Sequence, residues 1–367
     1  MAARIVVFGA TGYTGRLVSE RLVEQGARPV LAGRSEEALR EAAERLGGLE
    51  WQRADAMRQN SVFELVQPGD VLVSTVGPFA KWGDTAVRAA IAAGATYLDS
   101  TGEPEFIRRV FDELGPPARR SGAALLTAMG FDYVPGALAG ALALQDAGPG
   151  AARVDVGYYS LGVTASSASA GTRESLVGVS LADSHAFREG RLVTVRPAER
   201  VRSFTVKGKQ RAAISVGGAE HFSLPAAYPR LREVNVYIGW FGPLARPMQA
   251  GTLVGAYAQR LPGVRGALQL AGERLAGMVP GPEPGTTPGG LSWIAAEAYD
   301  ADGEKLAEAH LSGRDGYAFT GAFIAWAARR AAAEGVRGTG ALGPVEAFGL
   351  EALEEGCREA GLERVRE

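Results

Sequence analysis

The stretch of this sequence that most constrains the fold is RIVVFGATGYTG, residues 4–15. Its apolar first half predicts a short buried strand over residues 4–8, and the apolar spacing of residues 15–25 predicts a helix. Three glycines, Gly9, Gly12 and Gly15, occupy the connection. A strand, a glycine-rich turn and a helix in this order are typical of a domain that binds dinucleotide phosphates at the helix N-terminus.

Each glycine has a separate physical reason in such a turn. Gly9 permits a bend that a Cβ atom would obstruct, Gly12 lets the backbone approach a pyrophosphate, and Gly15 lets the helix pack closely. The spacing is G-x-x-G-x-x-G, a variant of G-x-G-x-x-G. A glycine-rich turn without a ligand is the alternative interpretation. We predict that the turn binds a dinucleotide, with further contacts from Thr11, Tyr13 and Thr14.

The end of the second predicted strand, residues 29–32, indicates which dinucleotide binds. NAD-binding domains usually place Asp or Glu there, to bind the ribose 2′-hydroxyl. This chain instead has Arg34 and Ser35. A guanidinium pairs with a 2′-phosphate through two hydrogen bonds and a hydroxyl can donate a third, whereas a carboxylate would repel it. The sequence therefore predicts NADP(H), unless Arg34 is only a solvated residue at a helix start.

Two further loops are expected at the edge of the sheet where open α/β sheets bind ligands. Asp55 follows the third predicted strand and is placed to contact the adenine, or else caps its own loop. After the fourth strand, small residues would let the backbone run beside the ribose and nicotinamide. A tight structural turn is the alternative for this second loop, which contains Val76, Gly77 and Pro78.

Up to about residue 130, short apolar runs alternate with helical stretches, which predicts a Rossmann-type, doubly wound parallel sheet. From residue 153 to 310 the pattern changes to alternating polar and apolar residues, with a hairpin turn at Asp302–Gly303. This predicts a second, α+β domain built on a largely antiparallel sheet. Helical patterns are expected over residues 248–278, 318–334 and 349–361, and a Pro/Gly loop over residues 279–290.

Composition excludes several classes of function. The 39 Lys and Arg residues nearly balance the 41 Asp and Glu residues, without a basic tract, so we expect no nucleic-acid partner. One cysteine, Cys357, excludes an intramolecular disulfide and fits a cytoplasmic protein, and three scattered histidines predict no His/Cys metal site. We see no signal-peptide pattern. Residues 123–144 are apolar, but Asp132 and Pro135 favour a strand, a loop and a helix over a transmembrane span.

Read in order, the motifs GATGYTG, LAGRS, STVGPFAKWG, YLDSTGE and GFDYVPG resemble the saccharopine dehydrogenase-like oxidoreductases, and within them the trans-acting enoyl reductase group. The resemblance implies an NADP-binding domain over residues 1–130 and an inserted substrate and dimerisation domain over 131–315. It also implies C-terminal helices over 316–367 that return to the first domain. The chain departs from the family at SGRDGYAFT, where an Asp-Pro-Gly-Tyr run is common, and at GTGALGP.

The catalytic candidates are polar residues on loops at the same sheet edge. Hydride transfer needs the nicotinamide placed against an electrophilic carbon, and an enolate product needs a hydrogen-bond donor and an acid. Tyr133 is a candidate proton donor or a packing residue, and Lys81 an oxyanion stabiliser or an exposed helix-start lysine. The resemblance places the loop of Asp99 and Thr101 beside the nicotinamide, with helix capping as the alternative. Residues 169–172 resemble a substrate-domain motif, and we expect His185 on a helix surface.

Three functions remain open at this point. The first is an NADP(H)-dependent reductase of a C=C bond, of the enoyl, lipid type, or of a C=N bond. The second is an amino-acid oxidoreductase like saccharopine reductase, which would need clustered arginines; Arg173, Arg188, Arg191 and Arg196 are not visibly clustered. The third is a non-catalytic NADP-binding or lipid-associated scaffold. Expected partners are a small, acyl-type substrate, a second copy of the chain and, at most, a peripheral membrane surface.

Overall fold

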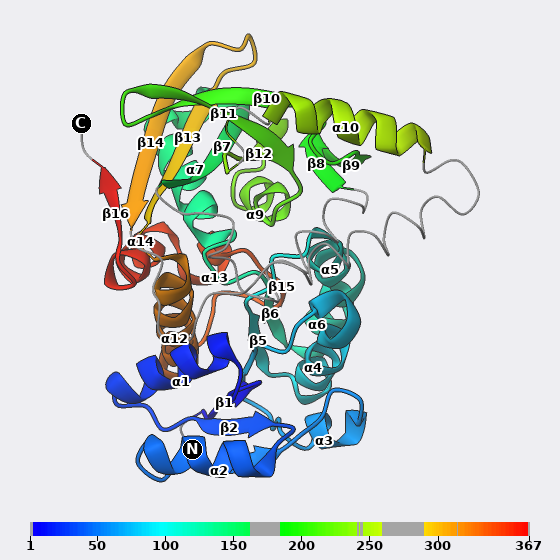
Figure 1. Cartoon of the computed structure of the whole chain (residues 1–367), viewed down its shortest axis with the longest axis vertical. Coiled ribbons are helices and arrows are strands. Elements are labelled where there is room, and N and C mark those ends of the chain that lie inside the picture. Colours follow the sequence, from blue (N-terminus) through cyan, green and yellow to red (C-terminus); the bar gives the residue numbers. More distant parts are fainter. Residues whose placement is uncertain are drawn as a thin grey trace. The chain divides into compact units, whose positions relative to one another are not determined.

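The computed structural model describes residues 3–161, 184–240, 242, 245–258, 290–313 and 315–365. The chain forms two compact units (Figure 1). The first unit comprises Met1–Thr101, Phe106–Val134 and Gly316–Gly361, and the second comprises Gly102–Glu105, Pro135–Asp315 and Leu362–Glu367. The chain thus leaves the first unit after Val134 and returns to it at Gly316, while its last residues belong to the second unit.

The first unit is built on a seven-stranded parallel sheet with the strand order β15-β6-β5-β4-β1-β2-β3. This is the predicted Rossmann-type architecture. Because the strands are parallel, the loops that follow them gather at one edge. The strands are β1 (Ile5–Phe8), β2 (Val30–Gly33), β3 (Trp51–Arg53), β4 (Val71–Ser74), β5 (Thr96–Asp99), β6 (Ala124–Leu126) and β15 (Gly340–Ala341).

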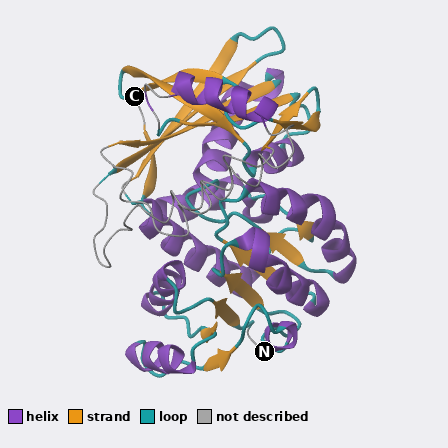
Figure 2. Cartoon of the chain, turned by 45° about the vertical axis from the view of Figure 1, so that its right-hand side comes forward, coloured by secondary structure: helices purple, strands orange, loops and turns teal. Residues whose placement is uncertain are grey.

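Helices lie on both sides of this sheet (Figure 2). Helix α1 contacts β1, and α12 contacts β1, β4 and β5. Helix α4 packs against β4 and β5, and α6 packs against β6. The helical elements of the unit are α1 (Tyr13–Glu24), α2 (Glu36–Arg45), α3 (Gln59–Phe63), α4 (Phe79–Ala93), α5 (Pro104–Arg109), a π-helical turn (Val110–Leu114), α6 (Gly115–Ser121), α12 (Gly316–Glu334), α13 (Pro344–Phe348) and α14 (Leu350–Glu359).

Helix α12 returns to the first unit because a glycine lets it lie directly against α1. A Cβ atom added at Gly321 would stand 2.8 Å from the Cβ of Leu17. At the start of α12 the ring of Tyr317 meets that of Tyr13 edge-on, with 5.2 Å between centroids. Thr320 accepts a hydrogen bond from the Phe131 N–H at 2.9 Å. The C-terminal segment therefore belongs to the packing of the first unit.

The second unit contains a nine-stranded sheet whose main order is β10-β11-β12-β7-β13-β14-β16, with β8 and β9 off this path. Most pairs are antiparallel, but β12 pairs with β7 in parallel, so the sheet is mixed. The strands are β7 (Arg153–Leu161), β8 (Ser184–Arg188), β9 (Arg191–Val195), β10 (Val201–Val206), β11 (Lys209–Val216), β12 (Glu233–Ile238), β13 (Leu291–Tyr299), β14 (Lys305–Gly313) and β16 (Leu362–Val365).

Several sequence predictions can be compared directly with the structure. Strands β13 and β14 form the hairpin predicted at Asp302–Gly303. Residues 123–144 form β6, a loop and the start of α7 (Val134–Ala147), as predicted. The prediction that His185 lies on a helix surface is wrong: it is a buried residue of β8, where its Nε2 lies 3.1 Å from the Gly218 carbonyl oxygen.

Among the described residues, the remaining helices of the second unit are α9 (Glu220–Ala227), α10 (Ala245–Ala258) and a 3-10 turn (Gly148–Gly150). Helix α10 accounts for the start of the helical pattern predicted over residues 248–278. The rest of that pattern, and nearly all of the loop predicted over residues 279–290, lie outside the described residues. No helix among the described residues is long and apolar enough to cross a membrane.

The contact between α1 and α12 makes a first prediction. Gly321→Ala forces the new methyl group against Leu17, and overpacking of this kind costs about 1–3 kcal/mol, against about 1 kcal/mol that alanine adds to helix propensity. We expect a lower melting temperature, measured by circular dichroism. Gly251→Ala in α10 is the control, because a Cβ there meets nothing within 4 Å and should be neutral or stabilising. Equal stability of the two variants would contradict this packing account.

Candidate cofactor site

The turn between β1 and α1 is shaped by its three glycines. Gly9 has a φ of +92°, in the left-handed region that favours glycine. Gly15 has no room for a side chain, because an added Cβ would lie 2.1 Å from the Gly9 carbonyl oxygen. Gly12 donates its N–H to that same oxygen at 2.9 Å. The first turn of α1 is therefore pressed against the loop that precedes it.

The N-terminus of α1 is open to a ligand. Gly12 is the N-cap residue and provides no side-chain hydrogen bond to the first-turn N–H groups, and the first turn contains no acidic residue. The first-turn N–H groups of a helix without a side-chain cap, with the positive end of the helix dipole, favour an anion. The neighbouring side chains are in keeping with an open site: Thr11 and Thr14 are half-buried and Tyr13 is 48% exposed.

Thr75 is a contributor to this turn that sequence reasoning missed. Its hydroxyl donates to the carbonyl oxygens of Phe8 and Gly9, at 3.2 Å each. It thereby ties the end of β4 to the end of β1. A Cβ atom at Gly9 would come within 2.6 Å of that hydroxyl oxygen. The only signal in the sequence was a threonine directly after a predicted strand, which is too common to single out.

Arg34 and Ser35 lie where β2 passes into α2. Both are exposed. Ser35 is the N-cap of α2, and its Oγ accepts a hydrogen bond from the Ala38 N–H at 3.3 Å, which leaves its O–H free to donate elsewhere. Among the described residues, no ion pair engages Arg34. The segment thus presents a guanidinium and a hydroxyl donor side by side.

The next two loops differ in how far their polar groups are already engaged. Asp55 accepts a hydrogen bond from the Met57 N–H at 3.0 Å, which is the local cap that the sequence left open as an alternative. Val76, Gly77 and Pro78 connect β4 to α4, with a cis peptide bond between Gly77 and Pro78. Gly77 is exposed, and a Cβ there would make only ordinary contacts, so this loop is not a crowded turn.

Asp99 lies fully buried at the end of β5, where its carboxylate joins two strand ends. It accepts hydrogen bonds from the N–H groups of Thr101 at 3.0 Å and Ala128 at 2.8 Å, and from the Thr127 hydroxyl at 2.8 Å. Burial raises the pKa of this carboxyl to about 6, although the hydrogen bonds oppose the rise. These contacts suit a residue that positions the loops after β5 and β6. Thr101 is itself fully buried.

The other catalytic candidates occupy different surroundings. Tyr133 is buried at 6% exposure, in the segment that follows β6. Lys81 is exposed in the first turn of α4, where its ammonium group lies 4.7 Å from the centroid of the Trp82 ring. Asp132, beside Tyr133, was not among the catalytic candidates, yet desolvation raises its pKa to about 6. The family-like segment at residues 169–172 lies outside the described residues.

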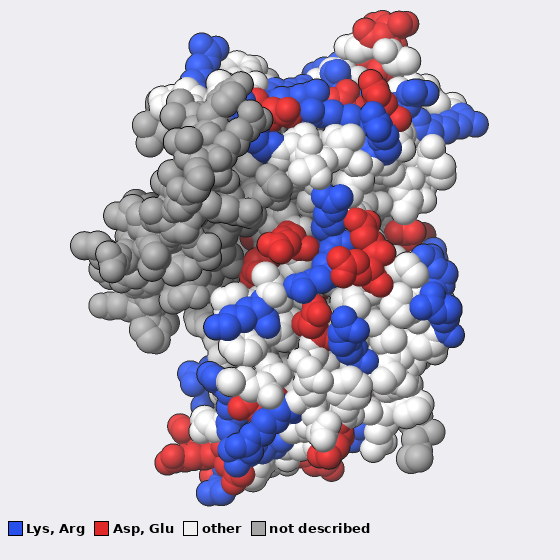
Figure 3. Space-filling model, turned by 90° about the vertical axis from the view of Figure 1, so that its right-hand side faces the viewer, with Lys and Arg blue, Asp and Glu red and all other residues white. Residues whose placement is uncertain are grey.

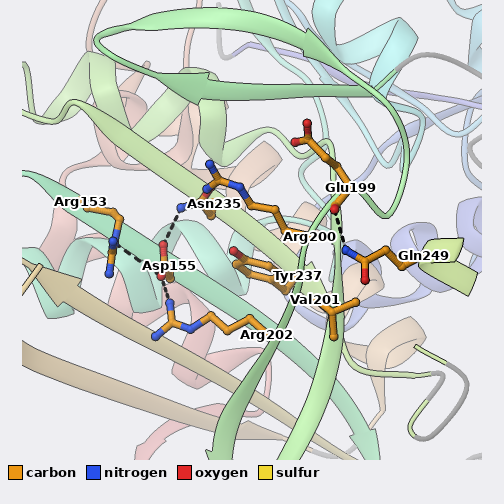
Figure 4. Close-up of a pocket in the computed structure, with 9 residues that line it drawn as sticks. All are labelled: Arg153, Asp155, Glu199, Arg200, Val201, Arg202, Asn235, Tyr237 and Gln249. Atoms are coloured by element: carbon orange, nitrogen blue, oxygen red, sulfur yellow. Dashed lines mark hydrogen bonds and ion pairs between the residues drawn. The ribbon is translucent and has the colours of Figure 1, made fainter. Parts of the chain in front are cut away.

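The second unit holds a polar pocket of about 520 Å³, shown in Figure 4. Strand β7 contributes Arg153 and Asp155, β10 contributes Arg202, and β12 contributes Asn235. Asp155 is the centre: it pairs with Arg202, accepts from the Asn235 amide at 2.7 Å and lies 3.6 Å from the Arg153 Nε. The remaining lining residues are Glu199, Arg200, Val201, Tyr237 and Gln249.

The arginines of this pocket are already matched by carboxylates. Arg202 also pairs with Glu297, and Arg200 pairs with Glu233 at 2.6 Å. Although burial opposes it, the hydrogen bonds from Arg200 and Asn235 lower the pKa of Glu233. The second unit therefore contains a cluster of arginines that the sequence did not predict to lie close together. Its charge is largely used to hold β10 against β7 and β13.

Charges of both signs also mix over the surface. On the face in Figure 3, Lys and Arg side chains alternate with Asp and Glu among the described residues. Within those residues, no group of three or more His, Cys, Asp or Glu side chains is arranged to hold a metal ion. The glycine turn of the first unit is therefore the site whose geometry points most directly to a ligand.

Residues 5–128 match the family model described as the saccharopine dehydrogenase NADP binding domain. This segment contains the glycine turn, Arg34 and the loops after β3, β4 and β5. Residues 5–128 of this chain are thus similar to that NADP-binding domain family. The cofactor predicted from Arg34 and Ser35, NADP(H), is confirmed by the family. The family resemblance of the motifs is confirmed as well.

Relatives whose names state an activity match about a third of the chain. A putative trans-acting enoyl reductase of Mycobacterium tuberculosis is 40% identical over 137 residues, which cover 36% of this chain and 33% of the relative. A trans-acting enoyl reductase of Mycobacterium ulcerans is 38% identical over the same length and coverage. The match thus spans about a third of the curated relatives.

One solved structure resembles the fold of the whole chain. The apo saccharopine dehydrogenase (L-Glu forming) of Saccharomyces cerevisiae aligns with a TM-score of 0.62 at 13% identity, and covers 99% of this chain and 100% of that one. At this identity the likeness concerns the fold alone. Together, the comparisons show an NADP-binding domain over residues 5–128 and, for the whole chain, the fold of that dehydrogenase structure.

The surroundings of Asp99 predict a specific pH dependence. Folding raises the pKa of this carboxyl from 3.8 to about 6, because burial favours its protonated form. The protonated group therefore contributes roughly 3 kcal/mol to the free energy of unfolding. This contribution is complete below about pH 4 and is lost as the pH rises through 6. In Asp99→Asn the amide oxygen can still accept from the two N–H groups and the NH₂ can donate to Thr127. We expect this variant to fold and to lose that pH dependence.

The measurement is urea unfolding of wild type and Asp99→Asn between pH 4 and 7. The difference in unfolding free energy between the two proteins isolates the titration of Asp99 from that of other groups that titrate in this range, such as Asp132. Asp99→Ala is the control that removes the acceptors at every pH. A constant difference in unfolding free energy between wild type and Asp99→Asn over this range would contradict the raised pKa.

Proposed function

We propose that this protein is an NADP(H)-dependent reductase that transfers hydride to a C=C bond of an enoyl, lipid-type substrate. The observation that carries the proposal is the uncapped glycine turn before α1, followed at the end of β2 by Arg34 and Ser35. The enoyl substrate class is supported by the names of the mycobacterial relatives, whose similarity lies within about a third of their length. A C=N bond is the nearest alternative acceptor.

Different residues of the chain would bind different parts of the cofactor. When bound, NADPH supplies the hydride. The turn from Gly9 to Gly15 holds its pyrophosphate at the start of α1, and Arg34 with Ser35 holds the 2′-phosphate. The loop containing Val76, Gly77 and Pro78 runs beside the ribose and nicotinamide. Adenine contact by Asp55 competes with the hydrogen bond that its carboxylate already accepts from Met57.

The proton and the developing charge on the substrate are assigned to two side chains. Tyr133 is proposed as the proton donor to the α-carbon, and Lys81 as a positive charge near the enolate oxygen. Asp132 is a second candidate acid, because its raised pKa of about 6 keeps part of it protonated near neutral pH. Asp99, whose carboxylate accepts hydrogen bonds from the N–H groups of Thr101 and Ala128, acts by positioning these two loops.

An amino-acid oxidoreductase is the second candidate, favoured by the pocket of Arg153, Arg200 and Arg202. Such an enzyme needs arginines that are free to bind substrate carboxylates. Here Asp155, Glu233 and Glu297 already pair with them, so a substrate would have to replace those carboxylates. This weighs against the second candidate. A cytoplasmic homodimer, with a small acyl-type substrate as its ligand, remains part of the proposal.

The test follows NADPH consumption with an acyl-chain enoyl thioester, and in parallel with L-glutamate and an aldehyde as the amino-acid alternative. We expect turnover of the thioester. If Tyr133 donates the proton, Tyr133→Phe should lower kcat by roughly 10²–10⁴-fold with unchanged NADPH affinity, whereas Asp132→Asn should retain most of the activity. Turnover of the amino acid alone, or NADPH binding without turnover of either, would contradict the proposed function.

A further inference from the structure

A second arginine lies beside the end of β2. Arg53 is the last residue of β3 and stands opposite Gly33, the last residue of β2, in the parallel register. The Ala54 N–H donates to the Gly33 carbonyl oxygen at 2.9 Å, which continues the pairing past the strand ends. Neighbouring strands lie about 4.8 Å apart, so Arg53 begins close to the segment that carries Arg34.

The side chain of Arg53 extends to the beginning of α2. Its Nη1 lies 3.4 Å from Oε1 of Glu36, the first residue of that helix. Glu36 directly follows Ser35, so the guanidinium lies at the helix end that Ser35 caps. The two side chains remain 54% and 51% exposed. An ion pair this exposed and this long contributes little to stability, so Arg53 can leave it at small cost.

We infer that Arg53 is a specificity-determining residue that binds the 2′-phosphate of NADP(H), and that Glu36 is its partner when the cofactor is absent. This inference rests on the NADP(H) binding that the proposed function requires. The 2′-phosphate binds at the end of β2, between the segment of Arg34 and the start of α2. Arg53 reaches the same place from the neighbouring strand.

The balance of charge explains why a second guanidinium matters there. The first turn of α2 contains two carboxylates, Glu36 and Glu37, which repel a phosphate dianion. Without Arg53, the single guanidinium of Arg34 would have to offset both carboxylates. With Arg53 turned from Glu36 to the phosphate, two guanidiniums oppose the two carboxylates, and each can form charge-assisted hydrogen bonds. NAD(H) has no phosphate at this position, so it gains nothing from Arg53.

The experiment measures binding, not turnover. The dissociation constants of NADPH and NADH are determined by calorimetric titration for the full chain and for Arg53→Gln, Glu36→Gln and Arg34→Gln. Arg21→Gln is the matched control, because Arg21 forms a similarly exposed pair with Glu24 on α1, at 2.7 Å. Circular dichroism checks that each variant is folded.

We expect Arg53→Gln to weaken NADPH binding about tenfold and to leave NADH binding within about twofold. Glu36→Gln should tighten NADPH binding about two- to threefold, and Arg21→Gln should change neither constant. Unchanged NADPH affinity in Arg53→Gln, with weaker binding in Arg34→Gln, would overturn this inference alone. Equal weakening of NADPH and NADH would also overturn it. Absence of NADPH binding by the wild type would overturn the proposed function as well.

Discussion

The first turn of α1 lies so close to the preceding loop that no side chain fits at position 15. A Cβ there would overlap the Gly9 carbonyl oxygen, at 2.1 Å. This contact sets the direction in which α1 leaves the sheet, and it leaves the helix start capped only by Gly12, without a side chain over its N–H groups. The same close approach therefore shapes the fold and creates the site for an anion.

Residues from distant parts of the sequence hold the other strand ends and helix α12 close to this turn. Thr75 ties the end of β4 to Gly9, and Asp99 ties the ends of β5 and β6 together. Helix α12 is held against α1 at Gly321 and places Tyr317 on the ring of Tyr13. A few hydrogen bonds, together with these two contacts between α1 and α12, thus hold the loops that are expected to surround a dinucleotide.

Local patterns predicted the parts of the fold whose causes are local. The strand, glycine turn and helix of residues 4–25, the Asp302–Gly303 hairpin and the helix α7 all follow from spacing and turn chemistry. The parallel pairing of β12 with β7 could not be predicted, because register between strands some eighty residues apart depends on tertiary packing. Strand β15, only two residues long, carries no pattern at all.

The same distinction between local and tertiary causes applies to the residues of the candidate site. Gly9, Gly12, Gly15 and Arg34 could be predicted as site residues because each has a reason within its own motif. Thr75, and Arg53 with its proposed role, were missed because the contacts that draw attention to them come from neighbours on adjacent strands. The arginine pocket was missed for the same reason. The sequence drew attention to Arg188 and Arg196, whereas folding brings Arg153 of β7 close to Arg202 of β10 and to Arg200, which directly precedes β10. Burial of His185 likewise depends on contacts with α9 and the loop before it.

The central claim is that the glycine turn before α1 binds the pyrophosphate of NADP(H). Calorimetric titration of NADPH into wild type and Gly15→Ala tests it most directly, with circular dichroism to show that both are folded. The account predicts measurable binding by the wild type and a loss of at least about a hundredfold in the variant, because the methyl group must push α1 away from Gly9. A folded Gly15→Ala that binds NADPH as tightly as the wild type would contradict it.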